Sequence, residues 1–106
     1  MGNSNKILSD LKKLAGKMTL NNEVEVYLFG SRARGDAGNN SDWDILIVVN
    51  KENVNLDTFN EYGMPYAEIG WKYGQQITPI CYTKEEWEKE SNSLFYHNVL
   101  QERIQL

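Results

Sequence analysis

Two aspartates stand two residues apart where an apolar run begins, and their spacing suits a metal ion. Asp42 and Asp44 flank Trp43, and the five residues after them read Ile-Leu-Ile-Val-Val. Side chains two residues apart in a strand leave the same face, which sets the two carboxylates roughly 7 Å apart. Mg²⁺ prefers oxygen ligands and usually shares its shell with substrate phosphates. The pair therefore predicts a metal site for phosphoryl transfer.

A glycine-rich turn precedes the aspartates and offers a place for the phosphates. The segment 30–35 reads Gly-Ser-Arg-Ala-Arg-Gly and follows a strand-like run. Backbone N–H groups at such a turn can bind an anion, and the N–H and hydroxyl of Ser31 would both reach a terminal phosphate. Arg32 or Arg34 would neutralise charge on the transferred group. A glycine turn alone can be an ordinary turn, and a pair of aspartates alone can be a solvated junction between a loop and a strand. Their combination favours a functional site.

Apolar residues at helical spacing predict the helices that must pack around this site. Gly74 is placed to end one helix, and Thr83 with Glu86 forms a capping box that opens another. The expected helices are 7–18, a short one over 31–36, 62–73, 84–90 and 94–103. The polar segment 50–58 is expected to be a surface loop.

Three segments have the pattern of β-strands, and two of them position the turn and the aspartates. Alternation predicts a strand over 23–29. Residues 43–49 are apolar on both faces, which is typical of a central strand covered on both sides. The third strand, 76–82, contains Pro79, which cannot donate a ladder hydrogen bond and so belongs at an edge or a bulge. The expected fold is a small α/β (α+β) domain, with a mixed three-stranded sheet packed with helices.

Chain length, net charge and the lengths of the apolar runs exclude several classes of protein. A chain of 106 residues is expected to form one domain, 1–106. The net charge of −4 argues against a broad surface that binds nucleic-acid phosphates. No apolar run approaches the ~20 residues that a membrane span needs, and the N-terminus lacks a signal-peptide pattern. We therefore expect a cytoplasmic protein that binds neither membranes nor bulk nucleic acid.

The ordered motif around the turn and the aspartates resembles that of a known family. Gly30-Ser31, Arg34-Gly35 and Ser41-Asp42-Trp43-Asp44, placed between two strands, are similar to the glycine-serine and Asp-x-Asp signature of the nucleotidyltransferase domain of the DNA polymerase β superfamily. The short chain more closely resembles the minimal nucleotidyltransferases. These include antitoxins that pair with a helical HEPN-domain protein.

The resemblance implies a nucleotidyltransferase fold and a reaction. A nucleoside monophosphate would move from an Mg²⁺-bound nucleoside triphosphate, with ATP expected, to an acceptor hydroxyl, and pyrophosphate would leave. Carried onto this sequence, Gly30 and Ser31 would hold the triphosphate, and we expect Arg34 to bind the nucleotide beside them. Asp42 and Asp44 ligate the metal and carry the catalysis. The expected acceptor lies on a partner protein, and the expected partner is a helical HEPN-like protein or a second copy of this chain.

The strand that follows departs from the family pattern. The family often supplies a third carboxylate there, as metal ligand and general base, whereas this strand offers Gln76, Thr78 and Pro79. Glu68, Glu61 or a partner would have to supply the missing acid. This departure keeps a second hypothesis open, in which the chain is a nucleotide-binding antitoxin or regulatory subunit that acts by binding a partner. A fragment of a DNA-repair polymerase is disfavoured by the acidic charge and by the lack of a template-binding lobe.

Overall fold

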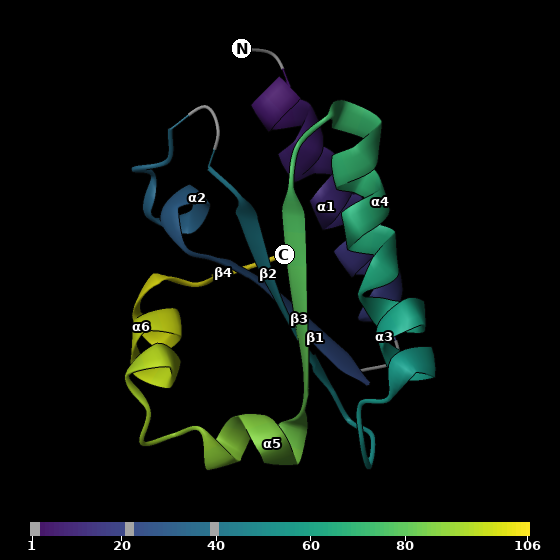
Figure 1. Ribbon diagram of the computed structural model, residues 1–106, viewed down its shortest axis with the longest axis vertical. Helices are drawn as coiled ribbons and strands as arrows, with labels where there is room; N and C mark the ends of the chain where they lie inside the picture. Colours follow the sequence, from purple (N-terminus) through teal and green to yellow (C-terminus); the bar gives the residue numbers. More distant parts are fainter. Residues whose placement is uncertain (1–2, 21–22, 39–40) are drawn as a thin grey trace.

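A four-stranded mixed sheet runs through the molecule and carries helices on both of its faces (Figure 1). The computed structural model describes residues 3–20, 23–38 and 41–106. The elements, in chain order, are α1 (Asn3–Met18), β1 (Val24–Phe29), α2 (Ser31–Arg34), β2 (Trp43–Val49), α3 (Leu56–Tyr62), α4 (Met64–Tyr73), β3 (Ile77–Thr83), α5 (Lys84–Lys89), α6 (Leu94–Glu102) and β4 (Ile104–Gln105). Across the sheet the strand order is β3-β2-β1-β4.

The pairing of β1 with β2 brings the glycine turn next to the aspartates. These strands are antiparallel, and Phe29 at the end of β1 pairs with Asp44 near the start of β2. Gly30 follows Phe29 directly, so the turn and Asp44 lie at the same end of the sheet. On the other side of β2, the parallel strand β3 sets Thr78 in register with Asp44.

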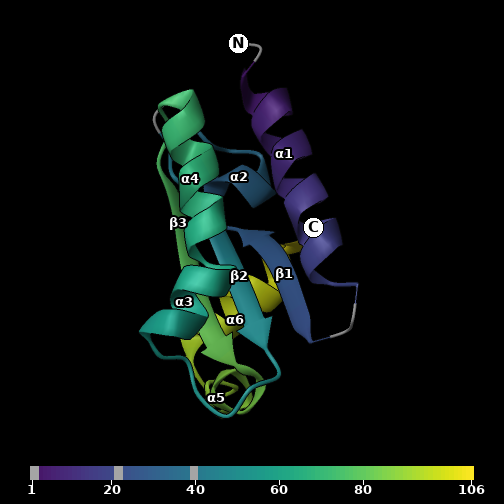
Figure 2. The same cartoon turned by 90° about the vertical axis from the view of Figure 1, so that its right-hand side faces the viewer.

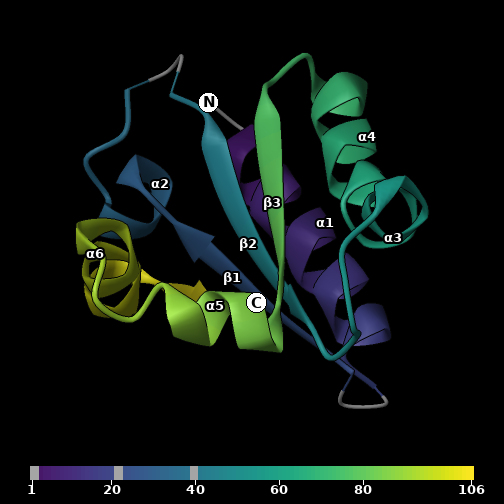
Figure 3. The ribbon, with the colours of Figure 1, turned by 60° about the horizontal axis from the view of Figure 1, so that its bottom comes forward.

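Two separate apolar layers hold the helices on the sheet. The first joins α1, α3 and α4 to the face that carries Leu28 and Ile45, and Figure 2 shows these helices in front of the sheet. The second joins α5 and α6 to the face that carries Leu46, and Figure 3 shows these two helices on the other side. Because side chains alternate along a strand, Asp44 belongs to the same face as Leu46. No helix in the described ranges has the length and apolar character needed to cross a membrane.

The sequence predictions about strand order and helix ends are largely confirmed. β2 is an interior strand, and β3, which contains Pro79, lies at an edge. Gly74 ends α4, and its N–H donates to the carbonyls of the last helical turn. The predicted capping box is present: Glu86 donates its N–H to the Thr83 hydroxyl and its carboxylate accepts the Thr83 N–H, both at 2.9 Å.

The prediction of three strands is wrong, because β4 adds a fourth. Ile104 pairs with Leu28 and Gln105 with Tyr27, antiparallel to β1. The sequence pattern extended the last helix to 103 and assigned nothing after it. A strand of two residues is too short to show an alternation of apolar and polar side chains, so its pattern is invisible in the sequence.

The predicted bounds of two central segments also need correction. The loop expected over 50–58 is too long, since α3 already begins at Leu56, where the side chain of Asn55 caps the helix. The single helix expected over 62–73 is divided into α3 and α4, with Gly63 between them. The apolar spacing continues through this break, so periodicity alone does not reveal it.

Replacing Thr83 by alanine is expected to destabilise the fold by about 1 to 2 kcal/mol. The Thr83 side chain is buried, and alanine would leave the N–H of Glu86 without its partner. The midpoint of urea unfolding measures this loss. Thr83→Ser is the matched control, because serine retains the hydroxyl; equal midpoints for the alanine and serine variants would show that the cap contributes nothing.

Candidate active site

The backbone at Gly30 is shaped so that a carboxylate can lie against it. Gly30 has φ 78° and ψ −161°, a conformation that is essentially restricted to glycine. A Cβ at this position would overlap Oδ2 of Asp44. The absence of a side chain therefore lets the Asp44 carboxylate reach the turn, and any larger residue would push it away.

One turn of helix, α2, follows Gly30. The Gly30 carbonyl accepts the N–H groups of Ala33 and Arg34, both at 3.0 Å. The helix ends two residues earlier than the predicted range 31–36, at the left-handed Gly35. Ser31, the residue expected to bind phosphate, is half-buried at the start of this turn. No hydrogen bond among the described residues uses its hydroxyl, which leaves that group available to a ligand.

Arg34 lies among the carboxylates of the site. Its Nη1 donates to Oε2 of Glu102 at 2.9 Å, and its Nε donates to Oδ2 of Asp36 at 3.2 Å. Its positive charge also acts on Asp44, where it partly offsets the burial and the neighbouring negative charges that raise the pKa of that carboxyl. The guanidinium thus contacts two carboxylates of this cluster and acts electrostatically on a third.

Arg32, the alternative to Arg34, supports the segment that leads into β2. Its guanidinium carbon lies 4.6 Å from the centroid of the Trp43 ring, and its Nη2 donates to the Ser41 carbonyl at 3.0 Å. Trp43 is buried in the layer under α1, on the face opposite Asp44, as the alternation predicts. Of the two arginines, Arg34 is the one whose charge acts on Asp44.

The two aspartates have different surroundings. Asp42 is exposed and Asp44 is half-buried. Burial raises the pKa of Asp44, and the negative charges of Asp42 and Glu102 raise it further against the opposing effect of Arg34. The cluster therefore holds more negative charge than its arginine neutralises, and a bound cation would relieve this repulsion.

The aspartate pair offers carboxylate oxygens that could form part of a metal shell. In the parts of the chain that the structure describes, no three His, Cys, Asp or Glu side chains are arranged to hold a metal ion by themselves. Mg²⁺ at phosphate-binding sites commonly takes only one or two carboxylates, and substrate phosphates and water complete its shell. The oxygen ligands of Asp42 and Asp44, beside the Ser31 hydroxyl and Arg34, fit an ion that is shared with a phosphate ligand.

Glu102 is a residue of this cluster that the sequence analysis missed. It is the last residue of α6, and its side chain is 16% exposed. Its Oε1 accepts the N–H of Gly30 at 3.0 Å, and its Oε2 accepts from Arg34. It lies 72 residues from Gly30 along the chain, so no local motif could have identified it.

Neither glutamate considered for the missing third acid lies on the face of the sheet that carries Asp44. Glu68 lines a hollow between α1 and α4, and Glu61 is an exposed residue of α3. These helices cover the opposite face. The hypothesis that Glu68 or Glu61 supplies the acid is therefore wrong, and the β3 position beside Asp44 is occupied by Thr78.

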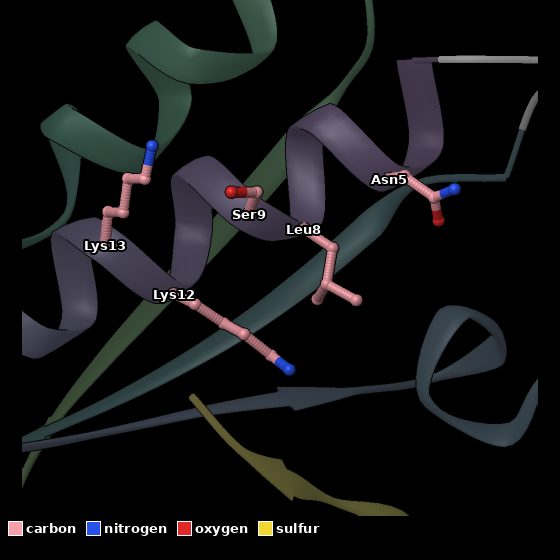
Figure 4. A pocket seen from close by; sticks show the side chains of 5 residues that line it. All are labelled: Asn5, Leu8, Ser9, Lys12 and Lys13. Atoms are coloured by element: carbon pink, nitrogen blue, oxygen red, sulfur yellow. The ribbon is translucent and has the colours of Figure 1, made fainter.

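A hollow along α1 lacks the chemistry of the aspartate cluster. It has a volume of about 430 Å³, and Figure 4 shows Leu8 and Lys12 extending to one side of the helix and Lys13 toward α4. Asn5 and Ser9 complete its lining, so it presents two lysines, an amide and a hydroxyl but no carboxylate. It could not hold a divalent cation.

A family model and a relative in an archaeon both match this chain. The model for the nucleotidyltransferase domain matches residues 4–104. A protein of Methanocaldococcus jannaschii, to which protein adenylyltransferase activity is attributed, is 38% identical over 78 residues. That alignment covers 74% of this chain and 72% of the relative.

Two solved structures share the fold. One is a toxin–antitoxin with AMP-PNP, which superposes with a TM-score of 0.59 at 17% sequence identity. The other is a mutant of the toxin–antitoxin MntA-HpeT, with a TM-score of 0.58 at 16% identity. Each superposition covers 92% of this chain and 69% of the other. The overall fold is thus common to all three.

Proposed function

Because this chain belongs to the nucleotidyltransferase domain family, we propose that Asp42 and Asp44 hold the metal ion with which it transfers a nucleoside monophosphate to an acceptor hydroxyl. The acceptor oxygen bonds to the α-phosphorus of a nucleoside triphosphate as the bond from that phosphorus to pyrophosphate breaks. The observation that carries the proposal is the approach of Asp44 to Gly30, which sets a carboxylate directly against the turn expected to hold phosphates.

The proposed roles follow from the surroundings of each side chain. The N–H and hydroxyl of Ser31 bond a phosphate of the nucleotide. Arg34 offers the phosphates the N–H donors that Glu102 and Asp36 leave unused. Mg²⁺ is the proposed ion, and when bound it neutralises the phosphates and makes the α-phosphorus easier to attack. The exposed Asp42 and the half-buried Asp44 fix its place relative to the turn.

We propose ATP as the nucleotide and a protein as the acceptor. The relative that is 38% identical has protein adenylyltransferase activity attributed to it. One of the structures that share the fold contains AMP-PNP, an adenine nucleotide analogue. Both observations favour transfer of AMP to a hydroxyl on a polypeptide.

The proposed partner is a helical protein of the HEPN type, as the sequence resemblance implies. Both similar structures are of toxin–antitoxins. Leu94 and Leu100 on α6 are 76% and 39% exposed, and this helix ends at Glu102 in the site. A partner that covers these apolar side chains would bring its own residues close to the nucleotide. A second copy of this chain is the alternative.

A second candidate function is nucleotide binding without turnover. The family often carries a third acid on the strand where Thr78 lies in register with Asp44. Without that acid, proton removal from the acceptor hydroxyl would depend on another group. The chain would then act as a nucleotide-binding antitoxin or regulatory subunit.

Label transfer from α-labelled nucleoside triphosphates distinguishes the two functions. Each nucleotide is incubated with Mg²⁺ in a lysate of the source cells, which supplies the acceptor, together with the wild-type protein or Asp42→Asn. We expect a labelled protein with ATP and the wild type only. Label from another nucleotide would overturn the choice of ATP. No label from any nucleotide, with binding retained, would favour the second candidate.

A further inference from the structure

Glu102 is a carboxylate of the site that the proposed function does not use. We infer that Glu102 is a positioning residue, which orients Arg34 and the backbone of Gly30 for the phosphates of the nucleotide. This inference rests on the proposed function, because it assumes that the turn binds a triphosphate. It assigns the C-terminal helix, which the motif does not include, a part in nucleotide binding.

The contacts of Glu102 fix two groups at once. One carboxylate oxygen accepts the Gly30 N–H at 3.0 Å, and the other accepts from Nη1 of Arg34 at 2.9 Å. Asp36 holds Nε of the same guanidinium. Since the guanidinium is planar, bonds at two of its nitrogens define its orientation. Arg34 is therefore held in place before any ligand arrives, which lowers the entropy lost on binding.

The backbone that carries Glu102 is itself anchored to the sheet. The N–H of Arg103 donates to the Val99 carbonyl at 2.8 Å, and Val99 is buried against β1 and β2 in the layer under α6. The Arg103 guanidinium lies 4.2 Å from the centroid of the Tyr27 ring. β4 then pairs with β1, and the N–H of Leu106 donates to the β1 carbonyl of Val26. The carboxylate thus projects from a fixed helix end rather than from a free tail.

Two other roles fit the geometry less well. As a metal ligand, Glu102 would have to join the aspartates, but no such group of three forms among the described residues. As a competitor for the phosphate site, Glu102 takes the N–H of Gly30 and one N–H of Arg34, but it has no hydrogen bond with Ser31. Three of the five N–H donors of Arg34 also stay clear of both carboxylates, so a phosphate can bind while Glu102 keeps its contacts.

The test compares Glu102→Gln with Glu88→Gln. Glutamine can still accept the Gly30 N–H, but it loses the charge that holds Arg34. Glu88 is exposed on α5, so its variant removes the same charge away from the site. We expect Glu102→Gln to raise the dissociation constant of Mg²⁺·AMP-PNP about tenfold, because it removes one charge-assisted hydrogen bond. The KM for ATP should rise by the same factor, with little change in kcat, whereas Glu88→Gln should match the wild type.

A double variant shows whether Glu102 acts through Arg34. Once Arg34→Ala has removed the guanidinium, adding Glu102→Gln should weaken nucleotide binding by less than about twofold.

The inference would be overturned if the double variant lost affinity by the product of the two single losses. It would also be overturned if Glu102→Gln bound the nucleotide more tightly than the wild type, because Glu102 would then be a competitor. Wild-type affinity in Glu102→Gln would refute the positioning role alone and leave the proposed function intact. A wild-type protein that binds no nucleotide would refute both. Thermal melting of each variant checks that it is folded.

Discussion

Asp42→Asn and Asp44→Asn will each lower the rate of nucleotide transfer by about a hundredfold or more while the protein stays folded. Each substitution replaces a carboxylate by a neutral amide and weakens the hold on a divalent cation. A metal ion that stabilises developing charge contributes several kcal/mol, and each ~1.4 kcal/mol is a factor of ten in rate. A loss of about 3 kcal/mol therefore corresponds to the expected effect.

The aspartate variants should lose transfer activity without losing thermal stability. The pKa of Asp44 is raised by burial and by the charges of Asp42 and Glu102, so its ionised form is disfavoured in the folded protein. A neutral asparagine at 44 relieves that repulsion, and we expect its melting temperature to equal or exceed that of the wild type. Asp57→Asn, on the helix α3 of the opposite layer, is the matched control for activity. Full transfer activity in Asp42→Asn or Asp44→Asn would remove these residues from the metal site.

Gly30→Ala will strongly lower transfer activity, whereas Gly35→Ala will largely retain it. Both glycines have a positive φ, 78° and 86°, so a side chain costs about 1 to 3 kcal/mol of stability at either position. At Gly35 no atom lies within 4 Å of an added Cβ. At Gly30 the Cβ would overlap Oδ2 of Asp44 and displace the metal ligand. The pair of variants therefore separates backbone strain from damage to the site.

The expected loss for Gly30→Ala is about a hundredfold in transfer rate, comparable with that of the aspartate variants, because it acts on the same carboxylate. Unfolding in urea gives the stability of both variants, and label transfer gives their activity. A Gly30→Ala protein that is folded and fully active would show that Asp44 need not approach the turn. An equal loss of activity in both variants would attribute the effect to strain alone.

The central residues of this site could be predicted from the sequence because they are close together in the chain. Gly30, Ser31 and the two aspartates lie within fifteen residues, on two strands whose apolar patterns are clear. The antiparallel pairing of neighbouring strands then brings them together. The fold class and the interior place of β2 could be predicted for the same reason.

Other parts of the site depend on contacts that the sequence pattern does not encode. Arg32 and Arg34 are two positions apart on a helix of four residues, so the sequence cannot distinguish their roles. In the structure, Arg32 lies over the Trp43 ring, on the face of β2 opposite Asp44. Glu102 reaches Gly30 because β4 fixes the end of α6, and β4 has just two residues. The spacing of apolar residues predicts that α4 packs on the sheet, but not that α4, with Glu68, covers the face opposite Asp44.

A comparison of α-labelled with γ-labelled ATP tests the central claim most directly. The two nucleotides are incubated in parallel with Mg²⁺, the wild-type protein and the lysate that supplies the acceptor, with Asp42→Asn as the control. Nucleotidyl transfer predicts that the α-label enters a protein only with the wild type, and that no γ-label enters this protein, because the γ-phosphate leaves in pyrophosphate. A γ-label that enters protein in a reaction dependent on this chain would indicate a kinase reaction and contradict the account. Bound ATP with no transfer of either label would contradict it as well.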